Sequence, residues 1–236
     1  MRLNWLFPEP RGCAFCSRPV TVSKKVPLCA ECSGEIGWIV DPRCEQCGRQ
    51  MDSGSEEAAE PLYCQDCMRF TGDGEVINRA VVRYTQLARE VVSLYKYRGR
   101  EALANVLGVM MANVVRHEYR GQSIDAITYV PLHSRREGER GFNQAELLAK
   151  VISKELRLPI SSMLVRVKDT PKQSRQSRQY RIEGMERAFA LKRNICFHDT
   201  LLIVDDIYTT GATLRACARE LLRGGCSRVL AVTFAR

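Results

Sequence analysis

A run of four apolar residues that leads directly into two acids constrains the fold of this chain more than any other stretch. Residues 201–204 read Leu-Leu-Ile-Val, and Asp205 and Asp206 follow them. An uninterrupted apolar run is typical of a strand buried on both faces of a parallel sheet. Residues 209–213 then read Thr-Thr-Gly-Ala-Thr, and residues 214–222 place apolar side chains at helical spacing. The sequence therefore predicts a buried strand, an acid pair, a small-residue loop and a helix in succession.

The small-residue loop has the chemistry of an anion-binding site. Backbone N–H groups at the start of a helix and the helix dipole both point toward such a loop. Threonine hydroxyls add donors, and Gly211 permits a close approach or a positive φ. Carboxylates would repel the same anion, so Asp205 and Asp206 are better suited to sugar hydroxyls or a divalent cation. The predicted phosphate loop consists of Thr209, Thr210, Gly211, Ala212 and Thr213.

This order of apolar run, two acids, two further residues and Thr-Thr-Gly-x-Thr resembles the signature of type I phosphoribosyltransferases. No lysine follows Gly211, which separates the pattern from a Walker A loop. In that family the loop holds the 5′-phosphate of phosphoribosyl pyrophosphate, the acids hold the ribose hydroxyls, and Mg²⁺ bridges the pyrophosphate and ribose oxygens. The resemblance implies that Asp205 and Asp206 are catalytic and that residues 209–213 bind the ligand. The alternative is an ordinary buried strand followed by a capped helix.

The N-terminal part of the chain carries four Cys-x-x-Cys pairs. These are Cys13/Cys16, Cys29/Cys32, Cys44/Cys47 and Cys64/Cys67. Each pair can place two thiolates on one turn, and two pairs complete a tetrahedral site, so two structural Zn²⁺ sites are predicted in a double zinc ribbon. Sequential pairing is favoured, and a cross-braced arrangement of the first pair with the third stays open. A disulfide framework is disfavoured because no secretion signal is recognised.

The isolated cysteines and the net charge indicate the cellular compartment and the class of ligand. The isolated Cys196, Cys217 and Cys226 are expected to be core thiols in a reducing environment, which predicts a cytoplasmic protein. No apolar run reaches the ~18 residues of a membrane span, so membrane insertion is not expected. The formal charge of +9 falls if eight thiolates bind two zinc ions, and its sign fits a phosphorylated small molecule or nucleic acid.

The 236 residues are enough for one ordinary domain and a small module. We predict a zinc-ribbon module over residues 1–72 and an α/β domain over residues 73–236. Strands are expected over residues 76–84, 124–130, 201–204 and 228–234, and helices over residues 86–97, 101–119, 145–156 and 214–222. This alternation predicts a parallel sheet with its ligand beyond the carboxyl ends of the strands.

Two further stretches strengthen the resemblance. Residues 131–133 read Pro-Leu-His and residues 140–144 read Arg-Gly-Phe-Asn-Gln, within a charged loop. They resemble the ComF family, the late-competence proteins of bacterial DNA uptake, which join a cysteine-rich module to a phosphoribosyltransferase-like domain. Lys96 to Gly99 fits the same family, although a basic helix end would also be placed there by the dipole. The resemblance implies that Arg135 and Arg140 contact the pyrophosphate.

Residues 168–181 are polar and basic, which predicts a segment that is disordered in the free state and closes over bound ligand. Gln176 and Gly184 depart from the ComF pattern, so the contacts of this segment stay open. A solvated basic loop and a contact to single-stranded DNA are the alternatives.

Two functions remain open. The first is a ComF-type phosphoribosyltransferase, or a degenerate relative, that binds phosphoribosyl pyrophosphate with Mg²⁺ and acts in DNA uptake and natural transformation. Turnover stays open because no acceptor site is recognised. The second is a non-catalytic module that binds single-stranded DNA or a helicase-like competence protein and uses the phosphate site as a sensor or scaffold.

Overall fold

A computed structural model of the chain describes residues 12–20, 25–52, 62–69, 76–98, 101–168, 188–192 and 199–236. The helices are α1 (Ala30–Glu35), α2 (Gln65–Met68), α3 (Gln86–Arg98), α4 (Glu101–Glu118), α5 (Ser134–Arg140), α6 (Gln144–Leu156) and α8 (Ala212–Arg223). The strands are β1 (Ile77–Val82), β2 (Ala126–Tyr129), β3 (Leu164–Arg166), β4 (Phe189–Leu191), β5 (Thr200–Ile207) and β6 (Arg228–Ala235). Within these ranges, no helix is both long enough and apolar enough to span a bilayer.

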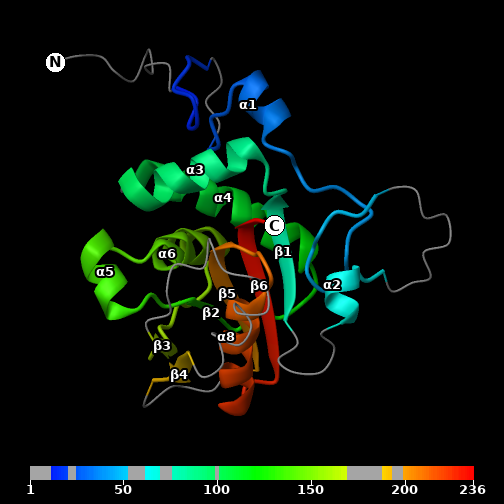
Figure 1. Ribbon diagram of the computed structural model, residues 1–236, viewed down its shortest axis with the longest axis vertical. Coiled ribbons are helices and arrows are strands. Elements are labelled where there is room, and N and C mark those ends of the chain that lie inside the picture. The colour runs from blue at the N-terminus through cyan, green and yellow to red at the C-terminus, as the bar shows by residue number, and fades with distance from the viewer. Residues whose placement is uncertain are drawn as a thin grey trace.

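Four strands form a parallel sheet in the order β1-β6-β5-β2 (Figure 1). Its two central strands, β5 and β6, are the most apolar, because helices cover both of their faces. Strands β3 and β4 pair antiparallel in a separate two-stranded sheet. The predicted parallel-sheet α/β fold is confirmed.

Alternation along β5 divides the core into two layers. Leu202 and Val204 pack with α3, α4 and α6, whereas Leu201 and Ile203 pack with α8 on the opposite face. Cys217 and Cys226 are buried in the α8 layer, as predicted for core thiols, and Cys196 lies outside the described residues. Apolar packing therefore fills both faces and leaves polar groups to collect at the carboxyl ends of the strands.

The two cysteine clusters lie on different sides of the α/β domain (Figure 1). The first ribbon (residues 12–20 and 25–35) packs onto the helical layer through Phe15 and Leu28. The second ribbon (residues 41–52 and 62–69) runs beside β1, where Asn78 N donates to Gln46 O at 2.7 Å. Gly48 lies so close to β1 that a Cβ there would be 2.8 Å from Asn78 O.

The second ribbon is part of the core of the α/β domain. Its four cysteines are buried in the same apolar cluster as the α8 layer of the sheet. The ion pairs of Glu118 in α4 with Arg43 at 2.5 Å and with Arg79 at 3.4 Å join the ribbon to α4 and β1. The boundary predicted between residues 72 and 73 falls outside the described residues and stays a prediction.

Candidate functional site

The acid pair lies near the carboxyl end of strand β5, inside the strand rather than in the loop that follows it. Strand β5 continues through Ile207, so Asp205 and Asp206 have extended backbone and their side chains leave opposite faces. Asp206 N donates to Asp205 Oδ1 at 2.8 Å. The pair therefore stands at the carboxyl end of the sheet, where ligands of open α/β sheets bind.

Lys96 of α3 is the counter-ion of the acid pair. Its Nζ pairs with Asp206 Oδ2, and the two side chains are only 24% and 13% exposed. Burial disfavours both charges, but the attraction between them is stronger. The pKa of Lys96 is therefore above its ordinary value, and that of Asp206 is below its ordinary value. Lys96 thus belongs to the site and is not a solvated helix end; the side chain of Arg98 lies outside the description.

The pKa of Asp205 shifts in the opposite direction from that of Asp206. Burial, and then the negative charge of Asp206, raise the pKa of Asp205 well above its ordinary value. One carboxylate of the pair is therefore held ionised by Lys96, and the other favours its proton. A ligand that donates hydrogen bonds from hydroxyl groups, or a cation, would stabilise the ionised form of Asp205.

The loop between β5 and α8 has the geometry of an anion site. Gly211 is the N-cap of α8 and has a φ of 76°, the left-handed conformation that glycine adopts most readily. A Cβ at this position would lie 2.1 Å from the Tyr208 hydroxyl oxygen, so the close approach allowed by glycine is also used. Thr210 Oγ1 accepts a weak hydrogen bond from Ala212 N at 3.4 Å. Both predicted properties of Gly211 are present.

Two arginines hold the carbonyl groups of this loop, and neither was recognised from the sequence. Arg215, one turn into α8, donates from Nη2 to Thr210 O at 2.6 Å. Arg236, directly after β6, donates from Nη1 to Thr209 O at 3.0 Å and lies over the Tyr208 ring at 4.6 Å. The spacing of Arg215 from Gly211 is a local signal that could have been read, whereas Arg236 is brought there by sheet pairing.

Part of the stretch predicted as a charged loop over residues 131–144 is helical, and that prediction is wrong. Helix α5 begins after His133, whose side chain accepts from Arg135 N at 3.4 Å, and ends at Gly141 with a φ of 78°. An N-cap and an αL glycine are sufficient signals for a short helix. The next helix, α6, has Asn143 as its N-cap, since Asn143 Oδ1 accepts from Ala145 N at 3.0 Å.

The two arginines assigned to the pyrophosphate differ in their surroundings. Arg140 donates from Nη1 to Gln144 Oε1 at 2.9 Å. The charge of Arg140 also acts, as the weakest of the causes, on the pKa of Lys96 and on that of Asp206. Arg135 pairs with Glu139 at 3.4 Å, with the two side chains 68% and 59% exposed. Arg140 therefore acts on the acid pair through its charge, whereas Arg135 lies on an exposed face of α5.

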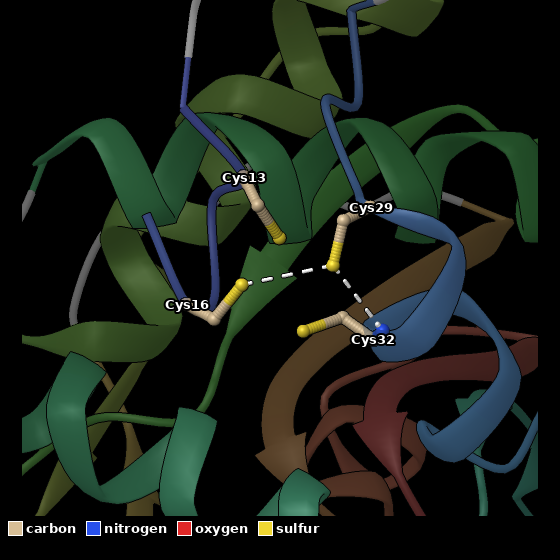
Figure 2. Close-up of side chains that lie close together, drawn as sticks. All are labelled: Cys13, Cys16, Cys29 and Cys32. Carbon is tan, nitrogen blue, oxygen red and sulfur yellow. Dashed lines mark hydrogen bonds between the residues drawn. The ribbon is translucent and has the colours of Figure 1, made fainter. Parts of the chain in front are cut away.

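The eight predicted cysteines form two tetrads. Cys13, Cys16, Cys29 and Cys32 form the first (Figure 2), and Cys44, Cys47, Cys64 and Cys67 form the second. Sequential pairing is thus confirmed, and the cross-braced alternative is wrong. The ligand atoms of each tetrad lie within 4.8 Å of one another, with Cys16 and Cys29 at 3.6 Å and Cys47 and Cys64 at 3.6 Å. Tetrahedral zinc with bonds of about 2.3 Å needs sulfurs about 3.8 Å apart, so both tetrads fit zinc.

The sulfurs of the second tetrad also have the electrostatics of a metal site. Hydrogen bonds among them lower the pKa of Cys44 and raise that of Cys67, so without a cation the thiols share their protons. A divalent cation would remove the repulsion between thiolates. Four cysteines leave no open coordination position, which is typical of a structural site.

Two expectations concern residues that the structure does not describe. The loop predicted to close over the ligand, residues 168–181, lies outside the described residues except for Lys168. Residues 54–60, whose small and acidic residues predict an exposed loop, lie outside them entirely.

Fold and site together define a phosphoribosyltransferase-like α/β domain joined to a double zinc ribbon. The family described as double zinc ribbon domain matches residues 2–68, and the family described as phosphoribosyl transferase domain matches residues 143–236.

Relatives with similar length identify the family more closely. Competence protein ComFC of Bacillus subtilis is 30% identical over 203 residues, which cover 84% of this chain and 79% of that protein. DNA utilization protein YhgH of Salmonella typhimurium is 30% identical over 226 residues, which cover 93% of this chain and 94% of that protein. The chain belongs to the ComF family. An adenine phosphoribosyltransferase from Leishmania tarentolae has a TM-score of 0.37 and 10% identity, covering 60% of this chain and 74% of that chain.

Proposed function

We propose that this chain binds phosphoribosyl pyrophosphate together with Mg²⁺ at the carboxyl end of β5 and acts in DNA uptake. One observation carries the proposal: an acid pair, a glycine-capped helix N-terminus and the half-buried ammonium group of Lys96 lie at the same end of one sheet. Each group suits a different part of this ligand. The ribbon–transferase architecture and the competence names of the relatives support the cellular role.

The phosphate loop is proposed to hold the 5′-phosphate. Residues 209–213 offer backbone N–H groups and threonine hydroxyls, and the dipole of α8 favours the negative charge. Asp205 and Asp206 are proposed to accept hydrogen bonds from the ribose hydroxyls. Mg²⁺ would neutralise charge on the pyrophosphate while that group is held or leaves.

The pyrophosphate is proposed to lie on the α3 and α5 side of the acids. Lys96 and Arg140 supply positive charge there, and Arg135 extends it along α5. Cations in this position would stabilise a departing pyrophosphate, which is where negative charge grows during pentosyl transfer. Ligand binding is the step shared by an active transferase and by a sensor, and pyrophosphate release in the presence of a nucleophilic acceptor separates the two.

The acid pair provides the sharpest test of binding. Asp205→Asn and Asp206→Asn are each expected to weaken binding of phosphoribosyl pyrophosphate about tenfold or more, because a hydrogen bond to a charged group contributes about 1.5–3 kcal/mol. Isothermal calorimetry with Mg²⁺ measures this against wild type. Glu35→Gln, which removes an exposed acid from α1 in the first ribbon, is the matched control and should bind as wild type does. Equal affinity in all four proteins would end the site assignment.

A contact to single-stranded DNA is the second candidate function, and a groove beside the first ribbon favours it. The groove has a volume of about 490 Å³ and is lined by Lys25, Lys150 and Lys154 together with residues of α4 and α6. Lysine side chains along a groove can bind successive phosphate groups of a single nucleic-acid strand. A helicase-like competence protein would then deliver the strand.

Salt dependence tests this second function. If the groove follows a single strand, the logarithm of the affinity should fall linearly with the logarithm of salt concentration, by about 0.7 for each phosphate contacted. The double variant Lys150→Gln/Lys154→Gln should lower that slope, as measured by gel shift over a salt series. Binding that ignores salt, or an unchanged slope in the variant, would rule out this surface.

A further inference from the structure

The second cysteine tetrad and the phosphate loop share one side chain, Arg236. One end of its guanidinium, Nη2, donates to Cys47 Sγ at 3.2 Å. The other end, Nη1, donates to Thr209 O at 3.0 Å, and the plane lies over the Tyr208 ring. The guanidinium group is rigid and planar. If either the Cys47 sulfur or the Thr209 carbonyl shifts, the guanidinium turns and its hydrogen bond to the other partner changes.

The backbone of Arg236 is held from both sides, so its position does not depend on the side chain. Arg236 N donates to Val82 O at 2.9 Å, which ties it to β1. On the other side, Tyr208 N donates to Ala235 O at 2.9 Å, which sets the start of the loop beside the end of β6.

The ribbon is held at the same corner through β1. Asn78 Nδ2 donates to Cys47 O at 3.1 Å, and the side chain of Asn78 is buried. The sheet order β1-β6-β5 therefore places the Cys47 turn on one side of Arg236 and the phosphate loop on the other.

Charge gives this contact its dependence on metal. Zinc bound by four thiolates carries a net charge of −2, and an arginine N–H next to a thiolate makes a charge-assisted hydrogen bond that is stronger than one to a neutral thiol. Without the metal, no bond fixes the position of the Cys47 sulfur, so Arg236 loses a fixed partner.

We propose that Arg236 is a positioning residue that couples metal binding at Cys44, Cys47, Cys64 and Cys67 to the shape of the phosphate loop. Zinc in the second tetrad orients Arg236, and Arg236 holds the Thr209 carbonyl so that the loop stays in its anion-binding form. Because coupling between two sites is reciprocal, a phosphate group on the loop holds the metal more tightly. Only this reciprocal part rests on the proposed function.

The first tetrad provides an internal control for the proposal. Its ribbon is joined to α6, where Lys25 pairs with Glu155 at 2.9 Å, and it packs on the helical layer rather than beside the loop. Loss of its metal should therefore leave the phosphate loop unchanged.

Hydrogen exchange of the loop tests the proposal without any ligand. In Arg236→Gln, which keeps both tetrads, peptides covering residues 205–215 should exchange about fivefold faster or more, and zinc should leave the second tetrad faster in a chelator assay. Arg236→Lys keeps the charge but cannot bridge both partners, so it should behave like Arg236→Gln. Arg228→Gln, at the opposite end of β6, is the matched control and should resemble wild type.

The outcomes separate this proposal from the proposed function. Loop exchange and zinc release that are both unchanged in Arg236→Gln would overturn the coupling, whatever the chain binds. Where wild type binds phosphoribosyl pyrophosphate, the ligand should slow zinc release about fivefold or more in wild type and not in Arg236→Gln. A wild-type chain that fails to bind this ligand refutes the proposed function alone, because the exchange experiment still decides the coupling.

Discussion

Replacing Gly211 with alanine is expected to abolish the binding of phosphoribosyl pyrophosphate. Gly211 has a φ of 76°, and a Cβ there would lie 2.1 Å from the Tyr208 hydroxyl oxygen and 2.9 Å from Arg215 Nη1. Both neighbours hold the loop, so neither can move without changing it. The strained φ adds a cost on the order of 1–3 kcal/mol. The loop should therefore open, and the N–H groups at the start of α8 should lose their common direction.

The expected loss is at least about 100-fold, since two lost hydrogen bonds to a charged phosphate contribute about 1.5–3 kcal/mol each. Calorimetry with Mg²⁺ measures it, and circular dichroism with zinc analysis shows that the variant is folded. Gly138→Ala is the matched control, because a Cβ at Gly138 meets nothing within 4 Å. A folded Gly211→Ala protein with the affinity of wild type would contradict the assignment of this loop to the phosphate.

Losing one zinc ligand is expected to have very different effects in the two tetrads. Cys47 is fully buried and lies in the apolar cluster shared with the sheet and α8. Cys47→Ala leaves the half-buried Arg236 without its sulfur partner and removes the metal from the core. Cys16 is exposed in the first ribbon, so Cys16→Ala should remove metal there and leave the α/β domain intact.

Each variant is expected to retain one zinc ion of the two. Cys47→Ala should lower the unfolding free energy of the α/β domain by several kcal/mol, because breaking a buried charge pair alone costs about 3–5 kcal/mol. Cys16→Ala should change it by less than about 1 kcal/mol. Metal analysis measures the zinc content, and denaturant unfolding followed by far-ultraviolet circular dichroism measures the unfolding free energy. Equal destabilisation by the two substitutions would show that the second ribbon is not part of the domain core.

Local patterns were sufficient for the parts of the site that are contiguous in the chain. The apolar residues of β5, the acids, the threonine–glycine loop and the apolar face of α8 follow one another within a single strand–loop–helix unit. Spacing alone also predicted that each Cys-x-x-Cys pair forms one turn. The misassigned stretch, residues 134–140, failed because its charged residues were interpreted as a binding loop while its capping signals were overlooked.

By itself, the sequence determined the parallel α/β fold, the zinc-ribbon class and the strand–loop–helix order around residues 209–213, because backbone preference, hydrophobic periodicity and ligand spacing act over a few neighbouring residues. Only the tertiary structure decided that Lys96 neutralises Asp206, that the second tetrad lies within the core, and that Arg236 touches both a zinc ligand and the loop. Arg236 and Cys47 are 189 positions apart in the chain. Contacts over such separations depend on strand order and on which faces pack together, and no local pattern encodes either.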